Sequence, residues 1–276
     1  MSDGVRTSER VRRWWDDGWS DADDSGEVRV IDSWLVEEGR VRGFGLHARR
    51  FAEACGRFAD VSAPLSPAPL HSALPHSAPP HSAPLHSATR TDAFFRAVAE
   101  SLPEQGRWFP RVELVDTGSR KRLRLWLRPA PPRTRTVRLW HAGPDRRAQP
   151  SVKGPDLDHL ASLRTAAQAA GADEALLLSP EGHVLEGSTT SIVWWRGDTL
   201  CGPPLGKVLP GVTRALLGPV TEELATPADL ANVPVWTVNA LHGIRPVTEG
   251  LGREPDLARA ERWQTRLEAL ASAPTT

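Results

Sequence analysis

A low-complexity segment at residues 62–89 limits most strongly how this chain can fold. The segment SAPLSPAPLHSALPHSAPPHSAPLHSAT is a degenerate repeat of His, Ser, Ala, Pro and Leu. It has too few bulky apolar residues to bury a core, and its prolines block regular strand pairing. We interpret it as a disordered insertion in a compact domain, where connections are usually short. Its histidines leave a metal-binding tract as an alternative, but a loop expansion without function is favoured, so we expect no metal site.

Apolar periodicity on both sides of the insertion predicts a mixture of strands and helices. VRVIDSWLV and RVRGF form an expected hairpin at 28–45, and LHARRFAEACGRF has the spacing of an amphipathic helix at 46–58. The alternation in RLRLWLR predicts a strand at 123–128. Further helices are expected at 92–101, 157–170, 212–217 and 255–271, and further strands at 108–115, 136–140, 174–178, 183–186, 191–195 and 235–238.

Mixed elements in two blocks predict an α/β (α+β) protein with two domains. We expect a partly ordered N-terminal arm at 1–26, a small domain at 27–142 that contains the insertion, a linker at 143–152 and a larger domain at 153–276. The arm is rich in tryptophan, which either covers an interface or packs on its own chain. The residues concerned are Trp14, Trp15 and Trp19.

Composition argues against several classes of protein. Lys and Arg total 34 and Asp and Glu total 34, so no basic excess favours nucleic acid. No apolar run reaches the roughly 18 residues that a membrane span needs. The N-terminus lacks the apolar core of a secretion signal, so we expect a cytoplasmic protein. Cys55 and Cys201 show no metal-binding spacing, so a structural zinc site or disulfide framework is not expected.

Lysine is rare, and the sequence contains no tyrosine. If the chemistry needs an amine, only Lys121, Lys153 and Lys207 are available. Lys153, in PSVKGPDLDHL, lies between an extended segment and a helix. A buried amine there would have the lowered pKa that Schiff-base chemistry needs, although a solvated lysine is the ordinary case. Lys121 and Lys207 are expected to face water.

Two downstream segments carry polar residues where a ligand could bind. GADEALLLSPEGHVLEGSTTS reads as strand, turn and strand, and places Glu186 at a strand end before a small polar run. A buried carboxylate could keep a pyridine nitrogen protonated, and a solvated hairpin glutamate is the alternative. LPGVTR precedes a helix whose free amides and Thr213 hydroxyl suit a phosphate, or form only an ordinary cap.

The order of Lys153, DEAL, Glu186, the small polar run, LPGVTR and NALHGIRPV resembles the class IV aminotransferase family, also called fold-type IV pyridoxal-phosphate (PLP) enzymes. That family includes branched-chain and D-amino-acid aminotransferases and 4-amino-4-deoxychorismate lyases. The resemblance covers residues 28–58 and 94–250 and is strongest over 171–216. It implies the two-domain fold-type IV architecture, with PLP in the interdomain cleft, and a homodimer.

The resemblance also assigns roles to residues. It implies that Lys153 binds PLP covalently and moves the α-proton of the substrate, and that Glu186 pairs with the pyridine nitrogen. Arg50 of HARRFAEAC would bind the phosphate together with Val212 and Thr213.

Weaker matches extend this site. The segment NALHGIRPV resembles a loop that contacts phosphate and substrate carboxylate. In IDSWLV, Asp32, Ser33 and Trp34 replace a segment that usually lines the pocket, and Ser191 stands where an asparagine is usual. Arg128 falls where some members bind substrate, although a surface arginine is the commoner case. The weaker candidates for cofactor or substrate contacts are Asn239, Ala240, Arg128, Ser191 and Trp34.

Three functions remain open at this stage, and the two enzymatic ones act on a small amino substrate. The first is a lyase that eliminates pyruvate from aminodeoxychorismate and leaves 4-aminobenzoate. The second is an aminotransferase of small or secondary-metabolite amino acids. The third is a binding protein that keeps the fold without catalysis. The absence of tyrosine argues against branched-chain and D-amino-acid specificities, whose pockets use tyrosine, and so favours the lyase.

Overall fold

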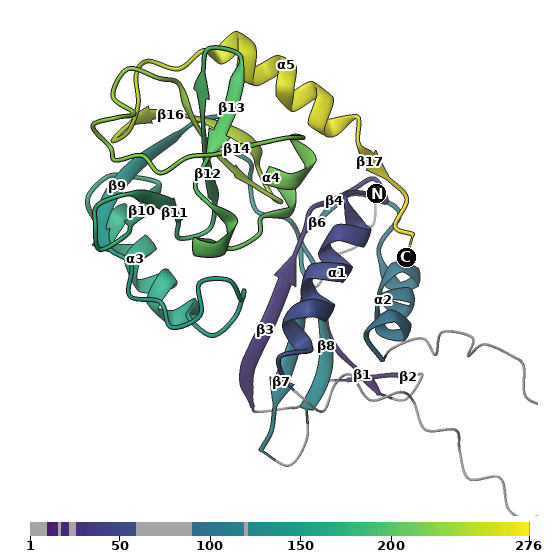
Figure 1. The fold of residues 1–276 in the computed structure, drawn as a ribbon. Coiled ribbons are helices and arrows are strands. Elements are labelled where there is room, and N and C mark those ends of the chain that lie inside the picture. The colour runs from purple at the N-terminus through teal and green to yellow at the C-terminus, as the bar shows by residue number, and fades with distance from the viewer. Residues whose placement is uncertain (1–9, 16–17, 22–25, 59–89, 119–120, 276) are drawn as a thin grey trace, which may run out of the picture.

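The computed structural model describes residues 10–15, 18–21, 26–58, 90–118 and 121–275. The expected disordered insertion at 62–89 lies outside these described residues. The described chain forms two lobes, each built around its own sheet, and a small third sheet lies where the lobes meet (Figure 1).

The smaller lobe contains an antiparallel sheet of five strands in the order β2-β1-β8-β7-β3. Its strands are β1 (Arg10–Trp15), β2 (Gly18–Asp21), β3 (Glu27–Ser33), β7 (Arg111–Asp116) and β8 (Lys121–Leu127). Helices α1 (Phe44–Cys55) and α2 (Arg90–Ser101) lie against it (Figure 1). In β8 the leucines of RLRLWLR are buried and alternate with partly exposed residues, as the sequence pattern predicts.

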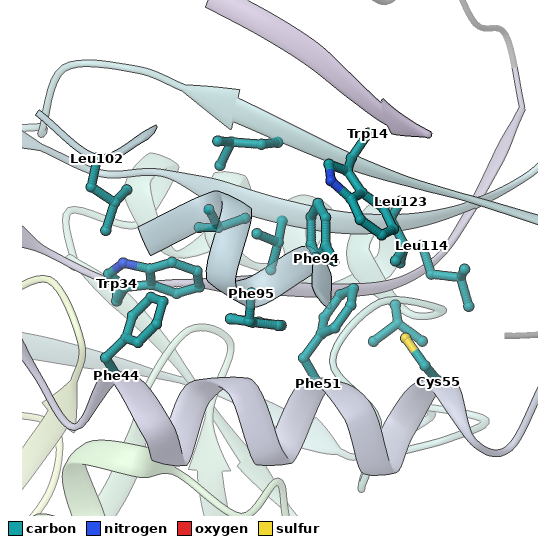
Figure 2. Close-up of a cluster of buried hydrophobic side chains, with 14 of the residues drawn as sticks. Trp14, Trp34, Phe44, Phe51, Cys55, Phe94, Phe95, Leu102, Leu114 and Leu123 are labelled. Atoms are coloured by element: carbon teal, nitrogen blue, oxygen red, sulfur yellow. The ribbon is translucent and has the colours of Figure 1, made fainter. Parts of the chain in front are cut away.

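Aromatic side chains fill the space between α1, α2 and this sheet (Figure 2). Phe51 of α1 and Phe95 of α2 meet edge to face with ring centroids 5.6 Å apart. Trp14 of β1 is 2% exposed and meets Phe94 in the same geometry. The expected N-terminal arm therefore supplies two strands and a core residue, because β1 pairs with the otherwise open edge of β8.

The larger lobe contains a sheet of eight strands in the order β11-β10-β9-β16-β15-β12-β13-β14. A further pairing of β11 with β12, at Glu186 and Ser191, joins six of these strands into a closed ring. The strands are β9 (Val137–Pro144), β10 (Glu174–Leu178), β11 (Val184–Gly187), β12 (Ser191–Arg196), β13 (Thr199–Gly202), β14 (Thr221–Glu222), β15 (Val235–Asn239) and β16 (Gly243–Glu249).

Helices flank the larger sheet, and the chain end returns to the smaller lobe (Figure 1). The helices are α3 (Leu157–Ala169), the 3-10 turn η1 (Leu205–Lys207), α4 (Val212–Leu216) and α5 (Leu257–Glu268). The third sheet has the order β17-β5-β4-β6. It is built from β4 (Val36–Glu37), β5 (Arg40–Arg42), β6 (Arg107–Trp108) and β17 (Ala271–Ser272). The pairing of β17 with β5 ties the C-terminal segment to the N-terminal half.

Two features differ from the sequence-based expectation. Strand β9, expected in the small domain and at the start of the linker, belongs to the larger sheet, because it pairs in parallel with β10 and β16. Strand β16 was expected to be part of a loop. Pro246 lies inside it, and a proline within a run usually argues against a central strand. The pairings of β9 with β10 and β16 join residues far apart in the sequence, so no local sequence pattern predicts them.

Candidate active site

A cavity of about 690 Å³ opens between the two lobes. Its size falls within the range of small-molecule sites. Side chains from both halves of the chain line it, including most residues that the sequence singled out. Those that line it are Arg50, Arg128, Lys153, Glu186, Ser191, Val212, Thr213, Asn239 and Ala240.

Lys153 is held against the edge of the smaller sheet by its own backbone. Its carbonyl oxygen accepts a hydrogen bond from the Ile31 amide at 2.7 Å. The following residue, Gly154, has φ 155°, and a Cβ there would lie 2.4 Å from the Arg29 carbonyl oxygen. The glycine is therefore required where the two backbones meet. This contact sets the position from which the Lys153 side chain reaches the cavity.

The environment of Lys153 favours the neutral amine. Burial lowers the pKa of this amine, and the Arg50 cation lowers it further. The carboxylates of Asp32 and Glu186 act in the opposite direction but do not reverse the shift. A neutral amine in a cavity wall is a nucleophile and a base, which a solvated lysine is not. Lys121 and Lys207, which are both in the described structure, do not line the cavity.

Glu186 is the penultimate residue of the buried strand β11 and lines the cavity from the larger lobe. Its Oε1 accepts hydrogen bonds from Arg147 Nη1 at 2.6 Å and from the Leu209 amide at 3.0 Å. Burial raises the pKa of Glu186, and the Arg147 cation partly offsets this effect. Within the described residues Oε2 accepts no hydrogen bond, so it remains available to a donor in the cavity.

Arg147 is a site residue that sequence reasoning missed. It lies in AGPDRRAQPSV, which was interpreted as a linker. Its guanidinium bridges Asp145 and Glu186, and only 4% of its side chain is exposed. The local signal was an aspartate two residues before an arginine in a segment otherwise expected to face water.

Arg50 lies on α1, one helical turn after His47, so both side chains share a helix face. Its Nε and Nη2 donate to the two oxygens of Asp32 at 2.9 and 2.7 Å. Its Nη1 donates to the Pro210 carbonyl at 3.1 Å, across the gap between the lobes. Asp32 is fully buried and also pairs with His47 Nδ1 at 2.8 Å. It was expected to line the pocket, and it instead lies behind Arg50 as that residue's partner.

The short helix α4 closes the same end of the cavity. Gly211 precedes it in an extended conformation, and Val212 and Thr213 are buried and line the cavity. The Val212 and Thr213 amides lie in the first helical turn, where backbone N–H groups have no intrahelical partner. A Cβ on Gly211 would lie 2.3 Å from Ser191 Oγ, which explains the glycine in LPGVTR.

The turn between β15 and β16 forms another wall. The Asn239 side-chain oxygen accepts from the His242 amide at 2.8 Å, and this bond fixes the turn. The Ala240 carbonyl accepts from Arg42 Nη2 at 2.8 Å, which links the turn to β5 of the third sheet. Asn239 and Ala240, two of the weaker candidates, therefore lie in a turn that hydrogen bonds hold in place.

The remaining candidates divide between wall and core. Arg128 lines the cavity, donates to the Phe109 carbonyl at 2.9 Å and stacks over the Trp126 ring. Ser33 lines the cavity as expected. Trp34, in contrast, is 1% exposed and packs in the core against Phe44 (Figure 2). Successive residues of an extended segment point to opposite faces, so Ser33 and Trp34 cannot both face the cavity.

A family model agrees with this arrangement. The model described as Amino-transferase class IV matches residues 29–249, which is most of the chain. The chain belongs to the class IV aminotransferase family. The matched region contains the whole eight-stranded sheet, β7, β8 and most of β3 from the smaller sheet, and every cavity residue named above.

Solved structures share the fold of this member of the class IV aminotransferase family over nearly its whole length. A fold IV-transaminase from Curtobacterium pusillum has a TM-score of 0.72 at 16% identity and covers 95% of this chain and 99% of its own. A PLP-bound hypothetical aminotransferase from Mycobacterium tuberculosis has a TM-score of 0.63 at 20% identity, covering 90% and 89%. A candidate 4-amino-4-deoxychorismate lyase from Legionella pneumophila has a TM-score of 0.64 at 17% identity, covering 89% and 91%. No curated protein matches the chain.

Family membership and these cofactor-bound neighbours support pyridoxal phosphate as the cofactor. The side chains fit its three functional parts. Arg50 keeps N–H donors for a phosphate, because its contacts to Asp32 and Pro210 use three of the five N–H groups that an arginine carries. Glu186 keeps Oε2 for a protonated ring nitrogen, and Lys153 has an amine whose lowered pKa favours the neutral form that reacts with an aldehyde.

The residues that the structure describes contain no group of three or more His, Cys, Asp or Glu side chains placed to hold a metal ion. None of the helices in the described ranges is both long and apolar enough to cross a membrane.

Proposed function

We propose that this class IV aminotransferase is a PLP-dependent enzyme that removes the α-proton of a small amino substrate in a reaction of lyase type. The observation that carries the proposal is the meeting of four side chains at one cavity. Lys153 comes from the segment before α3, Glu186 from β11, Arg50 from α1 and Thr213 from α4. A binding protein without catalysis has no need of a buried lysine amine with a lowered pKa beside Arg50 and α4.

Lys153 would hold the cofactor and move the proton. When bound there, pyridoxal phosphate supplies an electron sink that stabilises negative charge at the substrate α-carbon. The lowered pKa of the Lys153 amine favours its unprotonated form, which is the form that accepts a proton. The same nitrogen then carries the proton to the departing group in an elimination, or to a second carbon in a transamination.

Glu186 would hold a proton on the ring nitrogen. This role requires an ionised carboxylate, while burial raises its pKa. Arg147, at 2.6 Å, stabilises the ionised form and leaves the second oxygen open to the cavity. The opposite end would bind the phosphate through Arg50 and the first-turn amides of α4. Thr213 adds a hydroxyl there.

The cavity wall supports a substrate that bears carboxylates. Its arginines include Arg111, Arg128, Arg164 and Arg245. Two of its acidic residues are paired with arginines: Asp173 with Arg138 at 3.1 Å and Glu174 with Arg245 at 3.8 Å. A surplus of cations in a cavity attracts anionic substrates. Aminodeoxychorismate, which carries two carboxylates, fits this description.

In the lyase reaction Lys153 would take the α-proton, the C–O bond to the enolpyruvyl group would break, and pyruvate would depart to leave 4-aminobenzoate. The second candidate is an aminotransferase, which the family assignment itself favours. The same arginines would then bind the carboxylates of an amino acid and a keto acid.

The first experiment maps the anchor. The purified protein is incubated with PLP and reduced with borohydride, and the pyridoxyl adduct is located by mass spectrometry. We expect it on Lys153, with none in Lys153→Ala and an unchanged adduct in Lys207→Ala, the exposed control. A folded protein without an adduct at Lys153 would contradict the proposal and favour the non-catalytic fold.

The second experiment separates the two reactions. With aminodeoxychorismate and no keto acid, a lyase forms equal amounts of 4-aminobenzoate and pyruvate. An aminotransferase instead forms a new amino acid only when a keto acid is added. Product formation that depends on a keto acid would replace the lyase assignment with the aminotransferase.

A further inference from the structure

Asp32 is the most completely enclosed carboxylate beside the candidate phosphate site. It lies on β3, its side chain is fully buried, and it faces α1. Each of its oxygens accepts from the Arg50 guanidinium, and Oδ1 also pairs with His47 Nδ1. Burial alone would raise the pKa of Asp32, but the Arg50 and His47 contacts hold it well below its ordinary range. The carboxylate is therefore ionised at neutral pH.

The two-point contact fixes the direction of Arg50. A paired guanidinium and carboxylate lie in one plane, so the Asp32 bonds leave Arg50 little rotational freedom. The third bond, from Nη1 to the Pro210 carbonyl, crosses to the segment that leads into α4. The N–H groups that remain, one on each terminal nitrogen, belong to a guanidinium that lines the cavity.

His47 completes the arrangement from the same helix face. Burial lowers its pKa, so the ring is neutral at neutral pH. A neutral ring beside an ionised Asp32 donates from Nδ1, which makes Nε2 the unprotonated nitrogen. Asp32 therefore orders both side chains that α1 directs toward the cavity.

We propose that Asp32 is a positioning residue that holds Arg50 in the orientation in which its remaining N–H groups bind the cofactor phosphate. The inference rests on the proposed function, because it concerns the same site. It adds that Arg50 contributes phosphate affinity only while Asp32 holds it. Asp32 itself touches neither cofactor nor substrate.

The charge of Asp32 also reaches the amine of Lys153. Four charged groups act on that amine: Arg50 and Arg111 lower its pKa, and Asp32 and Glu186 raise it. Removing the Asp32 charge therefore lowers the pKa of Lys153 further. This effect comes from the charge alone, so it reports that Asp32 is ionised, whereas the phosphate-dependent part of cofactor binding reports the positioning role.

The test compares PLP with pyridoxal, which has the aldehyde and ring but no phosphate. Dissociation constants for both are measured by absorbance on the apoprotein, for the wild type, Asp32→Asn, Arg50→Ala and the double variant. Glu113→Gln is the matched control, because Glu113 is a buried carboxylate on the neighbouring strand that pairs with Arg111 and Arg124. The pH dependence of pyridoxal binding reports the Lys153 amine.

We expect Asp32→Asn to weaken PLP binding about tenfold to hundredfold, which is the range for losing a charge-assisted hydrogen bond. The dissociation constant for pyridoxal should change less than about threefold in Asp32→Asn. In Glu113→Gln, the ratio of the dissociation constants for pyridoxal and PLP should equal that of the wild type. The double variant should bind PLP no more weakly than Arg50→Ala, because Asp32 acts through Arg50. The pKa seen in pyridoxal binding should fall in Asp32→Asn.

Equal losses for PLP and pyridoxal, or additive losses in the double variant, would overturn the inference. If Asp32→Asn does not fold, Asp32→Glu carries the test, because it keeps the charge and shifts the carboxylate by one methylene. Asp32→Glu should lower the preference for PLP over pyridoxal, measured as the ratio of their dissociation constants, while the pKa of Lys153 stays unchanged. An unchanged ratio would contradict the inference. Arg50→Ala distinguishes this inference from the proposed function. If its ratio of dissociation constants for pyridoxal and PLP equals that of the wild type while an adduct still forms on Lys153, the inference is wrong and the proposed function stands.

Discussion

The Arg147 guanidinium donates to the Glu186 carboxylate over 2.6 Å, and both side chains are at least 95% buried. Asp145 binds the other side of Arg147, so one cation lies between two carboxylates. The arrangement joins the end of β11 to the segment after β9. It favours the ionised form of Glu186 and partly offsets the burial that raises the pKa of this acid.

Replacing Arg147 should therefore harm both stability and the site. We expect Arg147→Gln to lower the free energy of unfolding by about 3–5 kcal/mol, the range for a buried pair that loses one partner. Urea unfolding followed by circular dichroism measures this loss. Arg146→Gln is the control, because Arg146 is exposed and should change stability by less than about 0.5 kcal/mol. Equal effects of the two substitutions would show that the pair does not act as described.

The Lys153 amine makes the stability of the apoprotein depend on pH. Its pKa is lower in the folded than in the unfolded chain, so the unfolded chain binds more protons between those two values. The contribution of Lys153 to the free energy of unfolding therefore rises as pH increases from its folded pKa to its unfolded pKa. Below the folded pKa this contribution is most destabilising. We expect Lys153→Met to stabilise the apoprotein at neutral pH and the gain to shrink toward pH 10.5, the ordinary lysine value. Urea unfolding across pH, with Lys207→Met as an exposed control, would reveal a pH-independent difference if this explanation fails.

Gly154 should not tolerate a side chain. A Cβ would lie 2.4 Å from the Arg29 carbonyl oxygen, so Gly154→Ala must displace Lys153 or β3. Gly182→Ala is a matched control, because Gly182 has φ 86° and open space around its Cα. That control should lose only the roughly 1–2 kcal/mol that a left-handed alanine costs. We expect Gly154→Ala to lose more stability and to form less borohydride-reduced adduct on Lys153. If Gly154→Ala and Gly182→Ala lost the same stability and formed the same amount of adduct, the close contact between Gly154 and Arg29 would not be the reason for the glycine.

The aromatic core beneath α1 should dominate the stability of the smaller lobe (Figure 2). Phe51 is 1% exposed and contacts both Phe94 and Phe95. Phe51→Ala should cost about 3–5 kcal/mol, the usual range for a buried phenylalanine. Thermal and urea unfolding measure the effect, and Leu205→Ala, at a residue 46% exposed, should change little. A loss below about 1 kcal/mol for Phe51→Ala would mean that this core can collapse around the gap.

Local patterns in the sequence determined most helices and strands of this protein. The alternation of RLRLWLR gave β8, and the apolar spacing of LHARRFAEAC gave α1, because each pattern reflects which face of one element is buried. The order of Lys153, Glu186 and LPGVTR also brought the family resemblance into view, since those residue types at that spacing are specific in combination.

Tertiary structure alone decided the partners of these residues. Arg147 looked like a linker residue and Asp32 like a pocket residue until folding placed them against Glu186 and Arg50. Trp34 moved to the core, because an extended segment can turn only alternate side chains toward the cavity. Strand β9 joined the larger sheet through parallel pairing with β10 and β16, both distant in sequence. Periodicity records whether a side chain is buried, whereas which charge or strand it meets depends on long-range packing that no local pattern encodes.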